Sequence, residues 1–224
     1  MRTNLVFLAI LFSVMLVDSC IALTTQEVVQ RVQEEYEKIC SLTADFTQES
    51  TSKMLNQTRI TKAKGKAFFK KSGFMRWEYT TSPKNLWVSD GKTLWLYQPE
   101  ENQVIVEKVD PETGRVFLAF VMGEGDLTEE FDIHRWDQEV EESDEGYRIE
   151  LTPKQPHAMM DRLILTVDRK TSYVEGTEIY DAYGNLTQTR FKRVRVNREL
   201  PSDLFTFEIP PGTEVIQSHS EHSQ

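Results

Sequence analysis

The chain has 224 residues, a net charge of −10 at pH 7 and only two cysteines. This acidic balance argues against a nucleic-acid-binding protein, which presents a basic face to phosphates. It also disfavours passive adhesion to anionic membranes. The length fits one domain if the architecture is all-β or barrel-like, and no linker divides the sequence.

The N-terminal residues have the pattern of a secretory signal peptide. Arg2 supplies a positive charge, and residues 5–17 are almost uninterruptedly apolar but too short for a comfortable membrane span. The small residues Cys20 and Ala22 predict cleavage after Ala22. The chain then divides into a signal peptide at 1–22, a single domain at 23–216 and a flexible tail at 217–224.

A second interpretation of this segment stays open. Residues 17–20 loosely resemble a bacterial lipobox, in which Cys20 would be lipidated and would anchor the protein, although Asp18 fits that pattern poorly. If Cys20 is removed with the signal, Cys40 is the only cysteine left. An internal disulfide is then excluded, and stability must come from packing.

The mature chain opens with one amphipathic helix and continues as a series of strands. Thr24 and Glu27 form a capping-box pattern, and apolar residues recur at helical spacing as far as Cys40. From Leu42 the apolar period changes to two, which is typical of a strand. The strands predicted after this change lie at 42–46, 65–69, 75–79, 86–89, 93–97, 103–107, 131–133, 147–151, 163–167, 174–180, 186–196 and 205–209.

Two turns and one apolar block interrupt these strands. Asp90-Gly91 stands between apolar runs and predicts a tight hairpin, and Tyr183-Gly184-Asn185 marks another. Residues 115–122 form a dense apolar block that ends at glycines and predicts a short helix. The fold class is therefore mainly β, a meander of antiparallel strands with flanking helices.

Sequence motifs for catalysis and metal binding are missing. There is no G-x-S-x-G elbow, phosphate-binding glycine loop, H-E-x-x-H helix or paired C-x-x-C, so neither an enzyme nor a cofactor is predicted. A basic run follows late in the chain at Arg190, Lys192, Arg193, Arg195 and Arg198. It is most simply a solvated outer face, and the functional alternative is docking to an acidic protein partner.

The aromatic residues are the strongest functional signal. On the strand at 93–97, Leu94 and Leu96 face one way while Trp95 and Tyr97 face the other. A sheet that is apolar on both faces must be covered on both, by helices, a ligand or a partner. A well-filled core is the simplest explanation, and a concave apolar cavity is the functional one.

Five segments resemble the outer-membrane lipoprotein carrier family, LolA. They are SLTADFTQ from Ser41, RWEY at 76–79, LWVSDGKTLWLYQP from Leu86, ELTPK from Glu150 and LFTFEIPPG from Leu204. The resemblance runs from the first helix nearly to the tail. It implies an incomplete, half antiparallel β-barrel, closed on its open side by helices and enclosing an apolar cavity.

The resemblance also implies a function and partners. A member of this family is a monomeric periplasmic carrier that accepts acylated lipoproteins from an inner-membrane ABC-type releasing complex. It shields their acyl chains and passes them to an outer-membrane acceptor lipoprotein, without covalent chemistry. Two alternatives remain: an anchored acceptor or envelope-stress sensor with the same half-barrel, and a secreted lipid hydrolase, whose nucleophile the sequence does not display.

Strand facing and this resemblance together give candidate site residues. The predicted cavity lining is Phe46, Ala67, Phe69, Met75, Trp77, Tyr79, Trp95 and Tyr97 from the sheet, with Phe117, Phe120 and Met122 from the short helix. In the family a basic residue before a proline holds the helical lid by hydrogen bonding. The matching residue is Lys71, which precedes Ser72 instead of proline; Arg76 is the alternative latch, and either could be an ordinary solvated charge.

Overall fold

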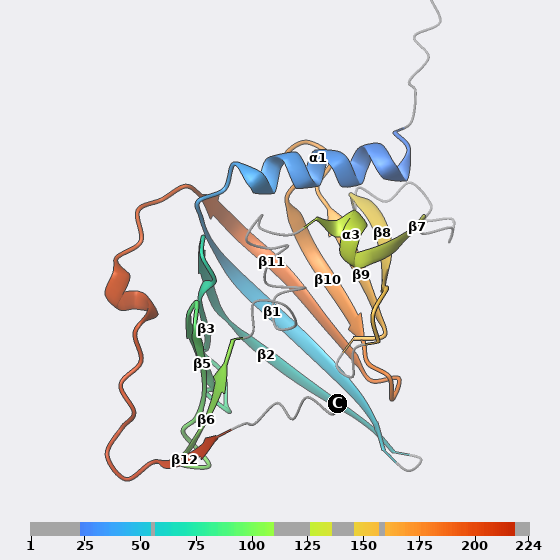
Figure 1. The fold of residues 1–224 in the computed structure, drawn as a ribbon. Coiled ribbons are helices and arrows are strands. Elements are labelled where there is room, and N and C mark those ends of the chain that lie inside the picture. The colour runs from blue at the N-terminus through green and yellow to red at the C-terminus, as the bar shows by residue number, and fades with distance from the viewer. Residues whose placement is uncertain (1–22, 55–56, 110–125, 136–145, 157–159, 218–224) are drawn as a thin grey trace, which may run out of the picture.

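The computed structural model describes residues 23–54, 57–109, 126–135, 146–156 and 160–217 (Figure 1). Within these residues the helices are α1 (Thr25–Glu37), α3 (Leu127–Glu130) and a 3-10 turn (Ser202–Phe205). The strands are β1 (Ser41–Met54), β2 (Gln57–Lys70), β3 (Phe74–Tyr79), β4 (Leu86–Asp90), β5 (Thr93–Gln98), β6 (Gln103–Lys108), β7 (Phe131–Arg135), β8 (Tyr147–Pro153), β9 (Arg162–Val167), β10 (Val174–Tyr180), β11 (Leu186–Val196) and β12 (Glu214–Gln217).

All of these strands belong to one sheet. Their order is β12-β6-β5-β4-β3-β2-β1-β11-β10-β9-β8-β7, and every neighbouring pair is antiparallel except β12 with β6. The long strands β1 and β2 occupy the middle, while β12 and β7 stand at the two ends and do not pair with each other. The predicted mainly β fold with flanking helices is confirmed, as one open sheet.

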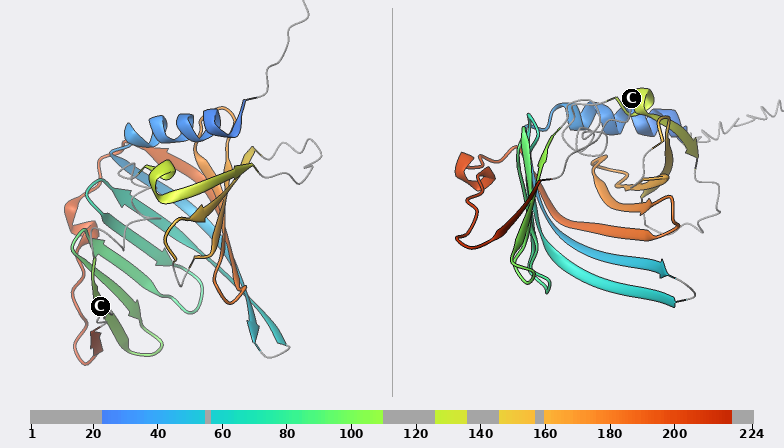
Figure 2. Two further views of the ribbon diagram at one scale, coloured as in Figure 1. Left: turned by 45° about the vertical axis from the view of Figure 1, so that its right-hand side comes forward. Right: turned by 60° about the horizontal axis from the view of Figure 1, so that its bottom comes forward.

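The sheet is curved, and the two α-helices lie on its inner side. Figure 1 shows α1 lying across one end of β11 and β10, and the turned views of Figure 2 show the strands bending around that side. We call this inner side the concave face and the opposite side the convex face. The main hydrophobic cluster lies between α1 and the concave face.

The start of α1 follows from the predicted capping box. The Thr24 hydroxyl accepts a hydrogen bond from the Glu27 amide at 3.2 Å, and the Thr24 amide donates to the Glu27 carboxylate at 2.7 Å. This second bond holds the pKa of Glu27 below its usual value. The helix ends at Glu37, earlier than its apolar pattern suggests, and the chain enters β1 at Ser41.

The strand predictions succeed in the middle of the chain and fail near its end. The turn at Asp90-Gly91 joins β4 to β5, with a positive φ of 85° at Gly91 and the Asp90 carboxylate accepting from two amides of the turn. The strand predicted at 205–209 is wrong. A 3-10 turn ends at Phe205, and residues 206–210 have no regular structure; Phe205 and Phe207 pack their rings against the convex face instead of pairing in a sheet. The helix predicted at 115–122 lies outside the described residues.

The C-terminal segment covers the convex face of β3 to β5. Phe205 is fully buried, with its ring centroid 5.6 Å from that of Phe74. The segment then returns along the outside of the sheet and ends in β12 beside β6 (Figure 1). One of the two apolar faces of the sheet is therefore covered by the protein's own tail.

Candidate functional site: the concave aromatic wall

Most of the sheet residues predicted to line a cavity gather where β1, β2 and β3 cross the concave face. The pairing register places alternate residues of these strands on the same side. Those that meet there are Phe46, Ala67, Phe69, Met75, Trp77 and Tyr79. All except Tyr79 are buried, and the Phe46 ring centroid lies 4.5 Å from that of Trp77. We call this set the aromatic wall.

Gly65 makes room for the wall. A Cβ atom at this position would lie 2.7 Å from ring carbons of Phe46 and 1.8 Å from the Glu78 carbonyl oxygen. Real Cβ atoms do not approach other atoms so closely, so only glycine lets the Phe46 ring lie flat over β2. The glycine thus sets the depth of the wall at its centre.

The wall continues onto β4 and β5 through residues that strand facing alone missed. Trp87 pairs across the strands with Trp77 and with Leu96, so all three share the concave face. The Trp87 ring lies 5.9 Å from that of Tyr79, and 36% of the Trp87 residue surface is exposed. The assignment of these residues to the concave face required the cross-strand register, which the sequence alone does not give. The wall therefore runs from a buried centre to an exposed apolar edge.

Trp95 and Tyr97 were predicted to line the same cavity, and this prediction is wrong. The register puts Trp95 opposite Val88, on the convex face. Both rings pack against Phe207 of the C-terminal segment, at centroid distances of 6.3 Å for Trp95 and 5.5 Å for Tyr97. Side chains alternate along β5, so the residues on either side of Leu96 cannot share its face. Phe117, Phe120 and Met122 lie outside the described residues.

A small polar chain crosses the otherwise apolar wall. The Tyr79 hydroxyl donates to the Gln48 side-chain oxygen at 2.9 Å, and the Gln48 amide donates to the Thr189 hydroxyl at 3.3 Å. Burial raises the pKa of Tyr79 to about 12, which keeps the hydroxyl protonated as a donor at neutral pH. The three side chains of this polar chain therefore satisfy one another within the protein.

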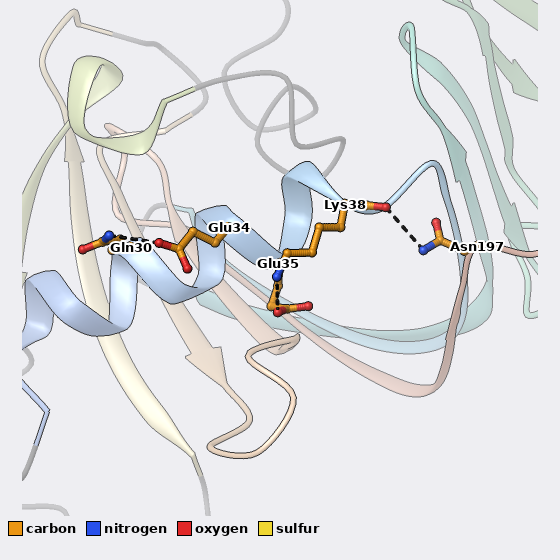
Figure 3. A network of polar contacts seen from close by, with 5 residues as sticks. All are labelled: Gln30, Glu34, Glu35, Lys38 and Asn197. Atoms are coloured by element: carbon orange, nitrogen blue, oxygen red, sulfur yellow. Dashed lines mark hydrogen bonds and ion pairs between the residues drawn. The ribbon is translucent and has the colours of Figure 1, made fainter.

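Helix α1 packs its apolar stripe into the same hydrophobic cluster as the wall, against β7 and β8. Val28, Val29, Val32 and Tyr36 of the helix are buried against the sheet. The Tyr36 hydroxyl accepts a hydrogen bond from the Val174 amide at 3.0 Å, and burial raises the pKa of Tyr36 well above its usual value. The outward side of the helix carries solvated pairs such as Gln30 with Glu34 (Figure 3). The helix is thus an amphipathic cover over one end of the concave face.

The C-terminal end of α1 is held by side chains from the sheet. The Lys71 ammonium group donates to the Glu37 carbonyl at 2.7 Å, and the Asn197 side chain donates to the Lys38 carbonyl at 3.3 Å (Figure 3 shows the second bond). The last carbonyls of a helix lack partners within the helix, and the helix dipole favours a cation beside them. Lys71 therefore lies where the resemblance expects a latch.

Arg76, the alternative latch, is on the other side of the sheet. Its guanidinium group donates to the Leu204 carbonyl at 3.1 Å and forms an ion pair with Glu78 at 2.6 Å. The prediction that Arg76 could hold the helical lid is wrong, because β3 alternates and Arg76 lies between the inward-facing Met75 and Trp77. Arg76 fastens the C-terminal segment instead.

Neither a metal site nor a membrane-spanning helix is found in the described part of the chain. No group of three His, Cys, Asp or Glu side chains in it could hold a metal ion. Among the same residues, no helix is both long enough and apolar enough to cross a membrane. The candidate site is an apolar surface that shares its hydrophobic cluster with a hydrogen-bonded helix.

Comparison with solved structures places this architecture among known folds. The chain is similar to an uncharacterized conserved protein from Thermus thermophilus, with a TM-score of 0.52 at 11% identity, covering 86% of this chain and 98% of that one. At this identity the likeness concerns the fold alone.

Sequence comparison then identifies the family. The sequence model of "Outer membrane lipoprotein carrier protein LolA" matches residues 37–208, and the chain therefore belongs to the LolA family of lipoprotein carriers. It is 30% identical over 189 residues to the outer-membrane lipoprotein carrier protein of Chromohalobacter salexigens, covering 84% of this chain and 86% of the relative. It is 31% identical over 175 residues to that of Nitrosospira multiformis, covering 77% and 80%.

Proposed function

We propose that this protein carries the acyl chains of lipoproteins through the periplasm on its concave face. The observation that carries the proposal is the aromatic wall, which reaches from the core beneath α1 to the half-exposed Trp87. In the proposed closed state α1 shares the hydrophobic cluster with the wall, and in the loaded state acyl chains replace the helix there. In this proposal the curved sheet is the half-barrel, and the space that the helix leaves is the apolar cavity.

The free energy gained by burying acyl chains is offset in part by the cost of displacing the helix. Each methylene group that leaves water gains about 0.8 kcal/mol, so several acyl chains would bind too tightly to be released from an empty cavity. In this proposal the chains would displace Val29, Val32 and Tyr36 from the hydrophobic cluster that they share with the wall, and that cost would lower the net affinity. A self-occupied wall thus makes binding reversible, as a carrier requires.

Lys71 has a defined part in this proposal. Its bond to the Glu37 carbonyl ties the end of α1 to the turn before β3, where Lys71 also donates its backbone amide to the Cys40 carbonyl at 3.0 Å. Breaking one side-chain bond at the end of the helix costs little, whereas the apolar stripe must leave the wall as a unit. We assign Lys71 as the latch that adjusts the opening of the helix.

The proposed route follows the family. The protein would be exported, with its signal peptide removed, and would receive lipoproteins from an inner-membrane ABC-type releasing complex. It would deliver them to an outer-membrane acceptor that binds the acyl chains more favourably. The proposal assigns no catalytic residue.

The acyl-chain site can be tested by fluorescence quenching, because two tryptophans lie on opposite faces. Trp87 is on the concave face, and Trp95 is on the convex face under Phe207. A lipopeptide with brominated acyl chains should quench the wild-type protein and the Trp95→Phe variant alike. Quenching should fall clearly in the Trp87→Phe variant. Loss of quenching only in Trp95→Phe, or none in the wild type, would refute the site.

A release assay tests the transport role separately. Spheroplasts bearing labelled lipoproteins should release them into a soluble complex with the wild-type protein. A mass spectrum of the native N-terminus distinguishes the carrier from the anchored alternative, since a diacylated Cys20 would identify a membrane-bound acceptor. Failure to release any lipoprotein, with acyl chains still bound, would separate lipid binding from transport.

A further inference from the structure

A basic groove runs along the convex face, on the opposite side of the sheet from the aromatic wall. Three adjoining open hollows of about 530, 310 and 600 Å³ follow one another along β1. The first two share Thr47 and Lys64, and the last two share Asp45 and Lys66, so they form one continuous groove. It follows β1 from Thr43 to Glu49, which is about 20 Å at ~3.4 Å per strand residue.

Two rows of cations line this groove. Outward-facing residues of β2 form one row, and residues of β11 and the segment after it form the other. The cations are Lys62, Lys64, Lys66, Arg190, Lys192, Arg193, Arg195 and Arg198. The sequence pattern showed only the second row, because the first is far away along the chain and comes beside it through the pairing of β1 with both strands.

The groove has a strong excess of positive charge in a chain whose net charge is −10. Asp45 and Glu49 are the acidic residues that line it among those described, and they pair with Arg193 and Lys62. In both ion pairs the basic side chain is exposed to solvent, so the pairs contribute little to stability. A local excess of this kind attracts and orients an anionic partner.

The shape of the groove favours a polypeptide strand over a membrane. The two basic rows flank a single strand, so they lie about 10 Å apart at ~4.8 Å between strands. This spacing suits one extended polypeptide chain, whose side chains would alternate toward the two basic rows. A planar lipid surface would touch only the crest of a convex face. Phe68 and Leu200 line one end of the groove and offer an apolar contact there.

We propose that this groove docks an extended acidic segment of a partner protein, about six residues long, with an apolar residue at the end that meets Phe68. The inference does not depend on acyl-chain binding, because the groove lies on the other face of the sheet. A carrier that used both faces could be held by its partner while the concave face stays open.

The test is fluorescence anisotropy with the full-length protein and a labelled peptide of about eight residues, long enough to span the groove. The acidic peptide contains glutamates and one terminal leucine. A control peptide, the glutamine peptide, has glutamine in place of each glutamate. The groove variant combines Lys64→Gln, Lys66→Gln and Lys192→Gln. The control variant makes the same change of charge elsewhere, with Lys84→Gln, Lys92→Gln and Lys108→Gln, all at exposed positions.

The wild type should bind the acidic peptide and not the glutamine peptide, with an affinity that falls as salt is added. The groove variant should bind about tenfold more weakly, and the control variant should change less than about twofold. Equal losses in the two variants would overturn the proposal, because binding would then follow net charge alone. Binding to phosphatidylglycerol vesicles without binding to the peptide would overturn it in favour of a membrane surface.

Discussion

Substituting Lys71 by methionine tests the latch, because it keeps the length of the side chain and removes its ammonium group. The bond to the Glu37 carbonyl is charge-assisted and lies at the C-terminal end of a helix. The bond is open to solvent, so water replaces it in part and the net contribution is about 0.5–1 kcal/mol. This corresponds to about a two- to fivefold increase in the opening of α1.

Hydrogen exchange measures this opening directly. In the Lys71→Met variant the amides of α1 should exchange about two- to fivefold faster, while those of β1 should not change. Lys92→Met, at an exposed turn, is the matched control and should leave α1 as in the wild type. Lys71→Arg should restore most of the protection, since a guanidinium group can also reach a carbonyl. Unchanged exchange in α1 of Lys71→Met would show that the latch contributes nothing.

Three further substitutions test the wall, its polar chain and the tail. Gly65→Ala should lower the free energy of unfolding by about 1–3 kcal/mol in urea, whereas Gly176→Ala, whose Cβ would lie 3.4 Å from its nearest neighbour, should cost clearly less; equal losses would contradict the close approach of the Glu78 carbonyl and the Phe46 ring to Gly65. Because burial raises the folded-state pKa of Tyr79 from 10.0 to about 12, its stabilising contribution is complete below pH 10 and is lost as the pH rises toward 12. Urea midpoints between these pH values should therefore fall less steeply for Tyr79→Phe than for the wild type, and parallel slopes would count against the effect. Phe207→Ala should expose Trp95 and shift its emission to longer wavelength, and no shift would mean that the tail does not cover this ring.

Local sequence signals predicted the elements whose causes are local. The capping box at Thr24 fixed where α1 begins, and the change of apolar period at Leu42 located the start of β1 to within a residue, although the strand continues to Met54. Asp90-Gly91 predicted its hairpin correctly, because a positive φ at one residue is a property of that residue. Period-two alternation also separated the two faces of β2, with Phe68 on one and Phe69 on the other.

The assignment of each face to the inside or the outside was not local. Trp95 and Leu96 differ little in their sequence surroundings, and only the pairing of β5 with β4 shows which of them shares a face with Trp77. Arg76 was misplaced for a different reason, since the alternation along β3 already puts it on the face opposite Met75 and Trp77. The cover on the convex face comes from Phe205 and Phe207, more than 100 residues further along the chain, where a strand had been predicted.

Residue patterns were enough to establish that this protein is mainly β, that an amphipathic helix precedes the sheet, and that its aromatic residues exceed what one covered face requires. Family membership also follows from the sequence, through the segments between Ser41 and the C-terminal prolines. The folded chain was needed to show which aromatic rings meet beneath α1, that Lys71 rather than Arg76 reaches the helix, and that two distant basic rows form one groove. These facts escape local patterns because strand pairing and curvature join residues far apart in sequence, and a one-residue change of register moves every side chain to the other face.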